Sequence, residues 1–160
     1  MSVQVSDVVE ALEVGDQLEQ FYDRAADELV WVFEDDLVAA DAVAAGGDLD
    51  AALDRTESGE PGQMSLALRI IQAEPGVFVR LPSNWDVHMH SIMEDFVVTL
   101  PESGLSRRLW DVLHHTGAFR RFKDMVYRYD LEDAWNRYRE DRLAEIARAW
   151  AEENDVPLAE

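Results

Sequence analysis

The spacing of apolar residues divides the chain into a front part that mixes helices and strands and a back part that is helical. Two runs rich in Val, Trp, Tyr and Phe, at 17–23 and 28–34, flank a polar turn and predict a β-hairpin over 17–34. A third run, VFVRLP at 77–82, predicts a strand that can join the hairpin. Helical spacing over 6–13 predicts a first helix, for which Ser6 is the expected N-cap.

From Asn84 onward, apolar residues recur every three or four positions and predict four helices. The third of these, over 117–129, has an expected buried stripe formed by Phe119, Phe122, Met125, Val126 and Tyr129. We therefore expect an α+β fold, with a small N-terminal antiparallel β-sheet packed with a C-terminal bundle of about four helices. The segment 65–74 fits either a short helix or a strand.

The chain has 160 residues, which is the size of a single domain, so we expect one domain over 1–160. The segment 36–62 is rich in Ala, Asp and Gly. We expect a helix over about 35–45 there, followed by a loop with short helical turns. This segment is therefore predicted to be a flexible insert.

Charge is distributed unevenly along a chain whose net charge is −20. Residues 1–60 hold 17 acids and two arginines, whereas 105–148 hold ten bases and eight acids. The acidic front fits a solvated surface, or a surface that mimics nucleic acid or docks on a basic partner. In each case long-range repulsion disfavours free nucleic acid as a partner.

Several kinds of site are excluded or disfavoured by residue types and motifs. There is no Cys, which excludes disulfides and thiolate metal sites, and no run is long enough to predict a membrane span. The N-terminal residues lack a signal-peptide pattern, so we expect a cytoplasmic protein. Nucleophile, phosphate-loop and zinc motifs are missing, so we expect no catalytic residue, no cofactor and no metal. The one metal arrangement worth testing is His90 and Glu94, four apart on a helix, with a distant third ligand.

Four segments carry a resemblance to a known family: IMEDF (92–96), GAFRRFKD (117–124), WNRYREDRL (135–143) and IARAWAEENDV (146–156). In order and spacing they resemble an uncharacterised bacterial protein family (UPF, number one-five-eight), with GAFRRFKD as the most specific part. The resemblance implies a bacterial-type cytoplasmic protein. It implies no activity, cofactor or catalytic residue.

The most distinctive stretch is HHTGAFRRFKDM, at 114–125, which places several bases near a predicted helix start. Thr116 can cap that helix, whose free N–H groups and nearby bases could together bind a phosphate or carboxylate. The residues of this hypothetical anion site are His114, His115, Thr116, Gly117, Arg120, Arg121 and Lys123. The alternative is that the two arginines pair with carboxylates of the chain itself.

Two further arginines, Arg139 and Arg142, fall inside the apolar stripe of the last predicted helix. They can form a structural ion pair with Glu94 or Asp95, or they can line a cleft shared with the first pair of arginines.

These patterns favour a non-catalytic binding or regulatory module with an Arg-rich contact region at 114–142. Its partner would be a protein or a small anionic ligand. Two alternatives are an enzyme acting on a phosphorylated small molecule, with His114 or His115 as the acid–base, and a nucleic-acid-mimicking acidic inhibitor of a basic partner. Exposed aromatic residues beside the basic helix would instead indicate a platform for single strands, which the net charge disfavours.

Overall fold

The computed structural model describes residues 2–14, 18–56, 61–83 and 87–160. It contains two compact units. Unit 1 comprises residues 1–83 and 147–160, and unit 2 comprises residues 84–146. The described residues form one three-stranded sheet and eight helices, so the predicted α+β class is confirmed.

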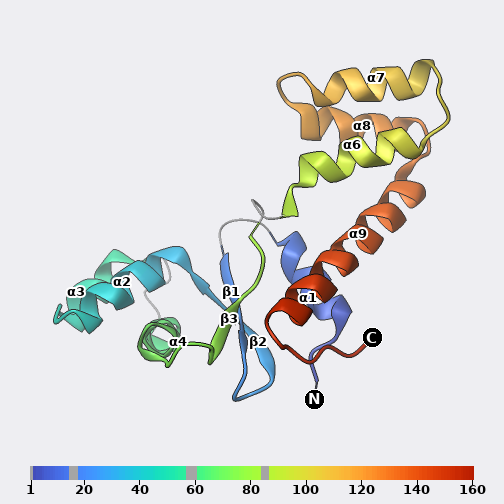
Figure 1. Ribbon diagram of the computed structural model, residues 1–160. Coiled ribbons are helices and arrows are strands. Elements are labelled where there is room, and N and C mark those ends of the chain that lie inside the picture. Colours follow the sequence, from blue (N-terminus) through green and yellow to red (C-terminus); the bar gives the residue numbers. More distant parts are fainter. Residues whose placement is uncertain (1, 15–17, 57–60, 84–86) are drawn as a thin grey trace. The chain divides into compact units, whose positions relative to one another are not determined.

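The sheet belongs to unit 1 and consists of β1 (Leu18–Asp23), β2 (Glu28–Phe33) and β3 (Phe78–Arg80), in the order β2-β1-β3 (Figure 1). β1 and β2 pair antiparallel, with Leu18 opposite Phe33, which confirms the predicted hairpin. β3 pairs antiparallel with the other edge of β1. The third strand therefore joins the hairpin as predicted, over fewer residues than 77–82. Residue 17, the expected start of the hairpin, lies outside the described residues.

Carboxylates hold the turn of the hairpin. Asp23 accepts hydrogen bonds from the backbone N–H groups of Ala25 and Ala26 through Oδ1, at 3.0 and 3.2 Å. This is the local bonding that favours Asp at turns. Asp27 adopts a left-handed backbone with φ 54°, and its Oδ1 accepts a hydrogen bond of 2.9 Å from the Tyr22 hydroxyl. The polar turn is thus fixed by its own side chains.

Four helices of unit 1 lie before β3 in the chain. They are α1 (Val5–Glu13), which precedes the hairpin, and α2 (Glu34–Ala44), α3 (Leu49–Arg55) and α4 (Pro61–Gln72), which follow it. The N-cap of α1 is Gln4, so the expectation of Ser6 was wrong. The reason is that Asp7, in the first turn, accepts a hydrogen bond from the backbone N–H of Gln4 at 2.8 Å, which satisfies this helix start. The segment 65–74, open between helix and strand, is helical in α4 as far as Gln72.

The segment 36–62 contributes to the core of unit 1. α2 matches the helix expected over 35–45, and α3 is a further short helix. Ala40 and Ala52 from this segment are buried in a cluster with side chains of the hairpin and α4. The members of that cluster are Phe21, Val32, Ala40, Ala52, Met64 and Ala67. Small alanine side chains allow the helices to approach one another closely.

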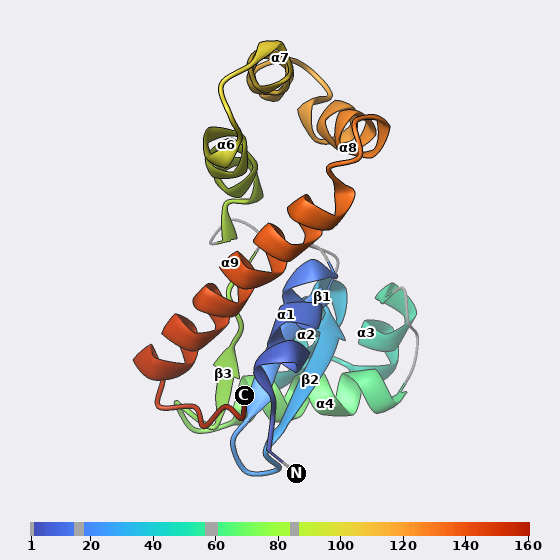
Figure 2. The same ribbon diagram turned by 90° about the vertical axis from the view of Figure 1, so that its right-hand side faces the viewer.

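The C-terminal segment of the chain completes unit 1. α9 (Glu132–Glu153) ends in this unit, and after it the backbone of Ala159 forms a parallel bridge with Gln4. Figure 1 and Figure 2 show the two labelled chain ends near each other. The Val5 N–H donates to the Ala159 carbonyl at 2.8 Å, and the Ala159 N–H donates to the Val3 carbonyl at 2.9 Å.

One arginine of the hairpin turn joins three separate parts of unit 1. The guanidinium of Arg24 donates to the carbonyl oxygens of Gly76, Asn154 and Asp155, at 3.0, 2.8 and 2.9 Å. These bonds connect the turn before β2 with the turn before β3 and with the residues after α9. Because carbonyls only accept and a guanidinium only donates, the match is complementary.

Unit 2 is helical and contains α6 (Met89–Thr99), α7 (Gly104–Leu113), α8 (Ala118–Arg128) and the first part of α9. These are the four expected C-terminal helices. The described residues contain eight helices, more than the four predicted, because four more lie in the N-terminal half. Figure 2 views α7 and α8 nearly end-on, as adjacent cylinders. Residues 84–86, the expected start of the first of these helices, lie outside the described residues.

An aromatic cluster fills the core of unit 2. The ring centroids of Phe96, Phe122 and Trp135 lie between 5.1 and 6.3 Å apart, in edge-to-face arrangements that aromatic pairs prefer. One ring comes from each of α6, α8 and α9. This cluster fixes which face of α8 is buried and therefore which face is left for solvent.

Candidate functional site

α8 begins at a glycine. Gly117 is the N-cap, with a left-handed φ of 75°, and no side chain caps the helix. The expectation that Thr116 caps α8 was therefore wrong. The left-handed conformation, which glycine adopts at no steric cost, reverses the chain immediately before the helix. The first helical bond runs from the Arg121 N–H to the Gly117 carbonyl, at 3.1 Å.

The adjacent histidines terminate α7. The Nδ1 of His114 lies 2.7 Å from the Trp110 carbonyl oxygen, and the Nδ1 of His115 lies 2.5 Å from the Asp111 carbonyl oxygen. A carbonyl oxygen can only accept, so each Nδ1 carries the hydrogen. Both rings thus bond to carbonyls of the last turn of α7, where helical N–H partners run out, and the Asp111 carbonyl also accepts the His114 N–H at 3.1 Å.

A third histidine, His90 of α6, is held at both ring nitrogens. Its Nε2 lies 2.6 Å from the Leu113 carbonyl oxygen, and its Nδ1 lies 2.7 Å from Oε1 of Glu94. Nε2 donates to the carbonyl oxygen, which can only accept. His114 is also close, with Nε2 3.9 Å from Oε2 of Glu94. The structure thus gathers His90, Glu94 and His114 at one point of unit 2.

This cluster does not form the metal site considered from the sequence. Neither ring nitrogen of His90 offers a free lone pair, because both are hydrogen-bonded. Within the described residues, no group of three or more His, Asp or Glu side chains has an arrangement that could hold a metal ion. The cluster instead ties the end of α7 to α6.

The basic residues of α8 face solvent. Arg120, Arg121 and Lys123 are all exposed. Among the described residues, no carboxylate oxygen lies within 4.0 Å of a charged nitrogen of these three side chains. Internal pairing, the alternative raised by the sequence, is therefore not what the described structure contains.

An aromatic residue that the sequence assigned to the core lies on the same exposed side of α8. Phe119 is 49% exposed and Tyr127 is 76% exposed, whereas Phe122 and Val126 are buried. The expectation that Phe119 is buried was wrong, because the core contacts α8 along the line of Phe122 and Val126. The ring of Phe119 lies 6.1 Å from that of His90, and about half of the residue is exposed to solvent.

Four residues of α8 together form an aromatic and cationic surface, which we call the α8 face: Phe119, Arg120, Lys123 and Tyr127. At about 100° per residue, all four point within a sector of about 100° around the helix axis. Tyr129, also expected to be buried, is exposed as the C-cap and accompanies Arg108, whose guanidinium lies 5.7 Å from its ring centroid.

The arginines of α9 are arranged differently. Arg142 donates from Nη1 to Oδ2 of Asp95 at 2.9 Å and to the Tyr138 hydroxyl at 3.0 Å. The hydrogen bond with Asp95 raises the pKa of Arg142 above its ordinary value. Arg139 is half-buried on the same helix, and Glu94 contacts histidines rather than an arginine. Of the two carboxylates expected from the sequence, Asp95 pairs with Arg142, and Oε2 of Glu145 lies 3.7 Å from its Nε.

A family model matches residues 62–160, which is more than half of the chain and includes all of α6 to α9. The chain belongs to the Uncharacterised protein family (UPF0158). The resemblance read from the GAFRRFKD segment is therefore confirmed at the level of the family. Neither a curated protein nor a solved structure matches this UPF0158 chain.

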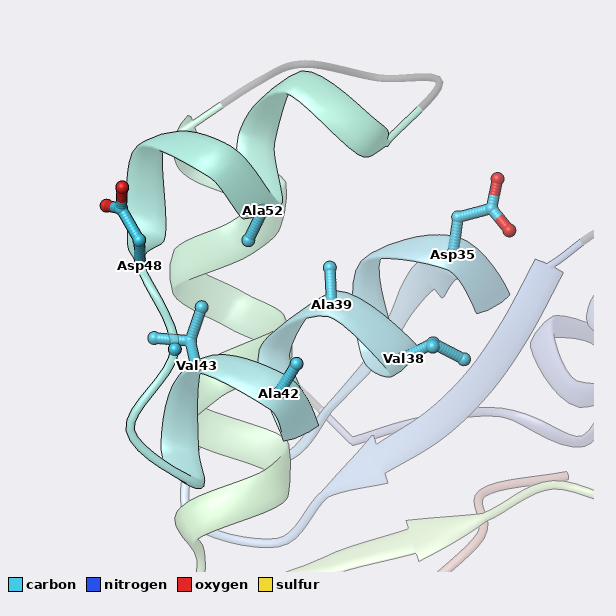
Figure 3. Close-up of a pocket in the computed structure, with 8 residues that line it drawn as sticks. Asp35, Val38, Ala39, Ala42, Val43, Asp48 and Ala52 are labelled. Atoms are coloured by element: carbon cyan, nitrogen blue, oxygen red, sulfur yellow. The ribbon is translucent and has the colours of Figure 1, made fainter.

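Two of the cavities found in the described part of the UPF0158 chain are lined by no residue of the α8 face. A cavity of about 230 Å³ in unit 1 lies between α2 and α3. In Figure 3, Ala39 and Ala52 point toward one another across it, and the carboxylates of Asp35 and Asp48 lie at opposite ends. In unit 2, a hollow of about 370 Å³ between α6 and α7 is lined by side chains that include Val98. Both are largely apolar.

None of the helices in the described part of this UPF0158 chain combines the length and apolar character that a bilayer span requires. A single apolar stripe, such as that of α8, is typical of a helix packed on a protein core.

Proposed function

We propose that this chain is a non-catalytic binding or regulatory module of the cytoplasm that contacts an anionic group of a partner through its Arg-rich region at 114–142. One observation carries the proposal. Arg120, Arg121 and Lys123 are exposed and, among the described residues, have no carboxylate within ion-pair distance. The chain holds 34 acids, and none of those in the described residues pairs with these three cations. The three cations are therefore available to a group from outside.

The local charge supports an anionic partner. Residues 118–128, which form α8, hold four bases and one acid, a net of +3. At physiological ionic strength charges are screened over about 8 Å, so an approaching anion responds mainly to the nearest side chains. Arginine adds bidentate hydrogen bonds to carboxylate or phosphate oxygens. The surface is thus suited to bind such a group even though the chain as a whole is acidic.

The absence of cysteine supports the assignment to the cytoplasm, because the fold uses no disulfide and needs no oxidising compartment. The other two functions considered from the sequence are an enzyme acting on a phosphorylated small molecule and a nucleic-acid-mimicking inhibitor. Both stay predictions, because no observation on the described residues favours either.

Calorimetric titration with two probes, tripolyphosphate and a poly-glutamate peptide, tests the proposal at low salt. We expect at least one probe to bind. Arg120→Gln, Arg121→Gln or Lys123→Gln should each weaken binding by about three- to tenfold, the effect of one lost charge-assisted hydrogen bond.

The matched control is Arg107→Gln, which removes one exposed positive charge from α7, outside the contact region. It should change the dissociation constant by no more than about twofold, the effect of a general change in charge. If no probe binds, or if the control weakens binding as much as the α8 substitutions do, the proposed function is wrong.

A further inference from the structure

We infer that the partner of the α8 face is single-stranded nucleic acid, whose bases stack on Phe119 and Tyr127 while its phosphates contact Arg120 and Lys123. This inference rests on the proposed function and names the class of partner. Proteins that bind single strands without reading sequence combine cationic side chains along the backbone with aromatic rings on which bases stack.

The order of side chains along α8 fits such a strand. Phe119, Lys123 and Tyr127 are four residues apart, so they follow one line along the helix. With a rise of 1.5 Å per residue, Lys123 lies about 6 Å along the axis from each aromatic residue, and the two aromatic residues lie about 12 Å apart. The surface thus alternates aromatic, cationic and aromatic groups, as a single strand alternates base, phosphate and base.

The exposure of the aromatic side chains favours this partner over others with negative charge. A carboxylate-rich protein segment would use the cations but would leave the open rings of Phe119 and Tyr127 without a matching flat surface. A duplex keeps its base faces inside the stack, where these rings cannot reach them. Every unpaired base has an exposed π-face, so a single strand uses both kinds of group on the α8 face.

The net charge of the chain does not oppose the inference at this location. Residues 84–146, which form unit 2, hold nine bases and 12 acids, a net of −3, whereas the remaining residues account for −17. Five of those 12 acids lie on α9, within 132–145, and only one lies on α8. At physiological ionic strength, screening limits the reach of these acids to about 8 Å. Phosphates next to α8 therefore respond mainly to the cations of α8. The sequence disfavoured nucleic acid on the net charge alone, which describes the whole chain and not the surface of α8, where Phe119 and Tyr127 are exposed.

Fluorescence anisotropy tests the inference with the full chain and labelled oligothymidine and oligouridine of about 12 nucleotides, a length within the site size of one small module. We expect binding at about 50 mM salt that weakens as salt rises, with a slope of about −0.7 per phosphate contacted. A duplex of the same length should bind more weakly than the single strand.

Substitutions separate stacking from charge. Tyr127→Ala and Phe119→Ala should each weaken binding by about five- to 100-fold, and Tyr127→Phe should retain it, since the ring and not the hydroxyl stacks. Lys123→Gln should reduce the steepness of the salt dependence by about 0.7. The matched controls are Val98→Ala, which removes exposed apolar surface from α6, and Arg107→Gln; both should bind within about twofold of the unchanged protein.

Each other outcome has a defined meaning. If tripolyphosphate or poly-glutamate binds through Arg120 and Arg121 but no oligonucleotide binds, the inference is wrong and the proposed function stands. If nothing binds, both are wrong. Strand binding that Tyr127→Ala leaves unchanged would show charge attraction without stacking and overturn the inference. If the chain self-associates and Tyr127→Ala abolishes that association, the inference is wrong, and the partner of the α8 face is a second copy of the chain.

Discussion

Single residues of this protein respond to their surroundings in ways that can be measured, and Tyr22 is the best-defined case. Its side chain is 2% exposed, and its hydroxyl donates to Asp27 at 2.9 Å. Burial is the main cause that raises the pKa of Tyr22 above its ordinary value of 10.0, and the hydrogen bond to Asp27 adds to it. The folded chain therefore favours the neutral phenol more strongly than the unfolded chain does.

The first prediction concerns stability at alkaline pH. Because the pKa of Tyr22 is raised in the folded state, its contribution to the free energy of unfolding is complete below pH 10. That contribution is lost as pH rises from 10 through the raised value. Tyr22→Phe should remove this part of the pH dependence and cost about 1 kcal/mol at neutral pH, the usual value of one hydrogen bond.

Urea unfolding of both proteins between neutral and strongly alkaline pH measures this difference. Wild type should lose stability more steeply than Tyr22→Phe above pH 10. Parallel curves would contradict the assignment of the pH dependence to Tyr22.

At the scale of elements, α8 shows how one helix can serve the core and a candidate binding surface. Phe122 has no exposed area and lies in the ring cluster with Phe96 and Trp135, whereas Phe119, three residues earlier, is half-exposed. The two phenylalanines are chemically the same and differ only in which side of the helix they occupy. They therefore form an internal comparison between a core residue and a surface residue.

The second prediction uses that pair. Phe122→Ala should lower the free energy of unfolding by about 3–5 kcal/mol, because it removes a buried ring and leaves a cavity. Phe119→Ala should change it by no more than about 1 kcal/mol, since only about half of its surface is covered by the fold. Thermal unfolding of the two variants decides the matter. Equal losses would mean that Phe119 belongs to the core after all, and would remove the basis for the α8 face.

The same helix shows what could be predicted from the sequence and what could not. Periodicity located α8 and its buried pair, and β-rich runs located the hairpin, because both are local signals. Periodicity could not decide whether Phe119 lies inside or at the border of the stripe, since that depends on which helices pack against α8. Nor could it bring His90 next to His114, which is 24 residues away and is placed by the packing of α6 on α7. The cations of the candidate site were identified from the sequence by their charge alone, but only the fold shows that their side chains are exposed.

At the scale of the whole molecule, two stretches of sequence far apart form unit 1. The residues after α9 supply the carbonyl acceptors of Arg24, the bridge to Gln4 and the buried side chain of Val156. Unit 2, by contrast, is formed by one continuous stretch, residues 84–146.

The third prediction follows from this division. Removal of residues 154–160 should reduce the stability of unit 1 by several kcal/mol, because an apolar side chain and several hydrogen bonds are lost together. Unit 2 should keep its own stability, since none of those residues belongs to its ring cluster. Hydrogen exchange followed by mass spectrometry measures both in one sample: amides of α1 and the hairpin turn should lose protection, while those of α6 and α8 should not. A uniform loss over all helices would show that the two units unfold as one.

The interleaved sequence of unit 1 also sets an order of events during synthesis. Residues 84–146, which form unit 2, are synthesised before residues 147–160, on which unit 1 depends. Domains usually complete their folding from the N-terminus onward, at a synthesis rate of about 5–20 residues per second. All three strands of the sheet lie within residues 18–80, but unit 1 is complete only when the last part of α9 and the residues beside Gln4 have also been made. Synthesis of unit 1 therefore begins before that of unit 2 and is completed after it.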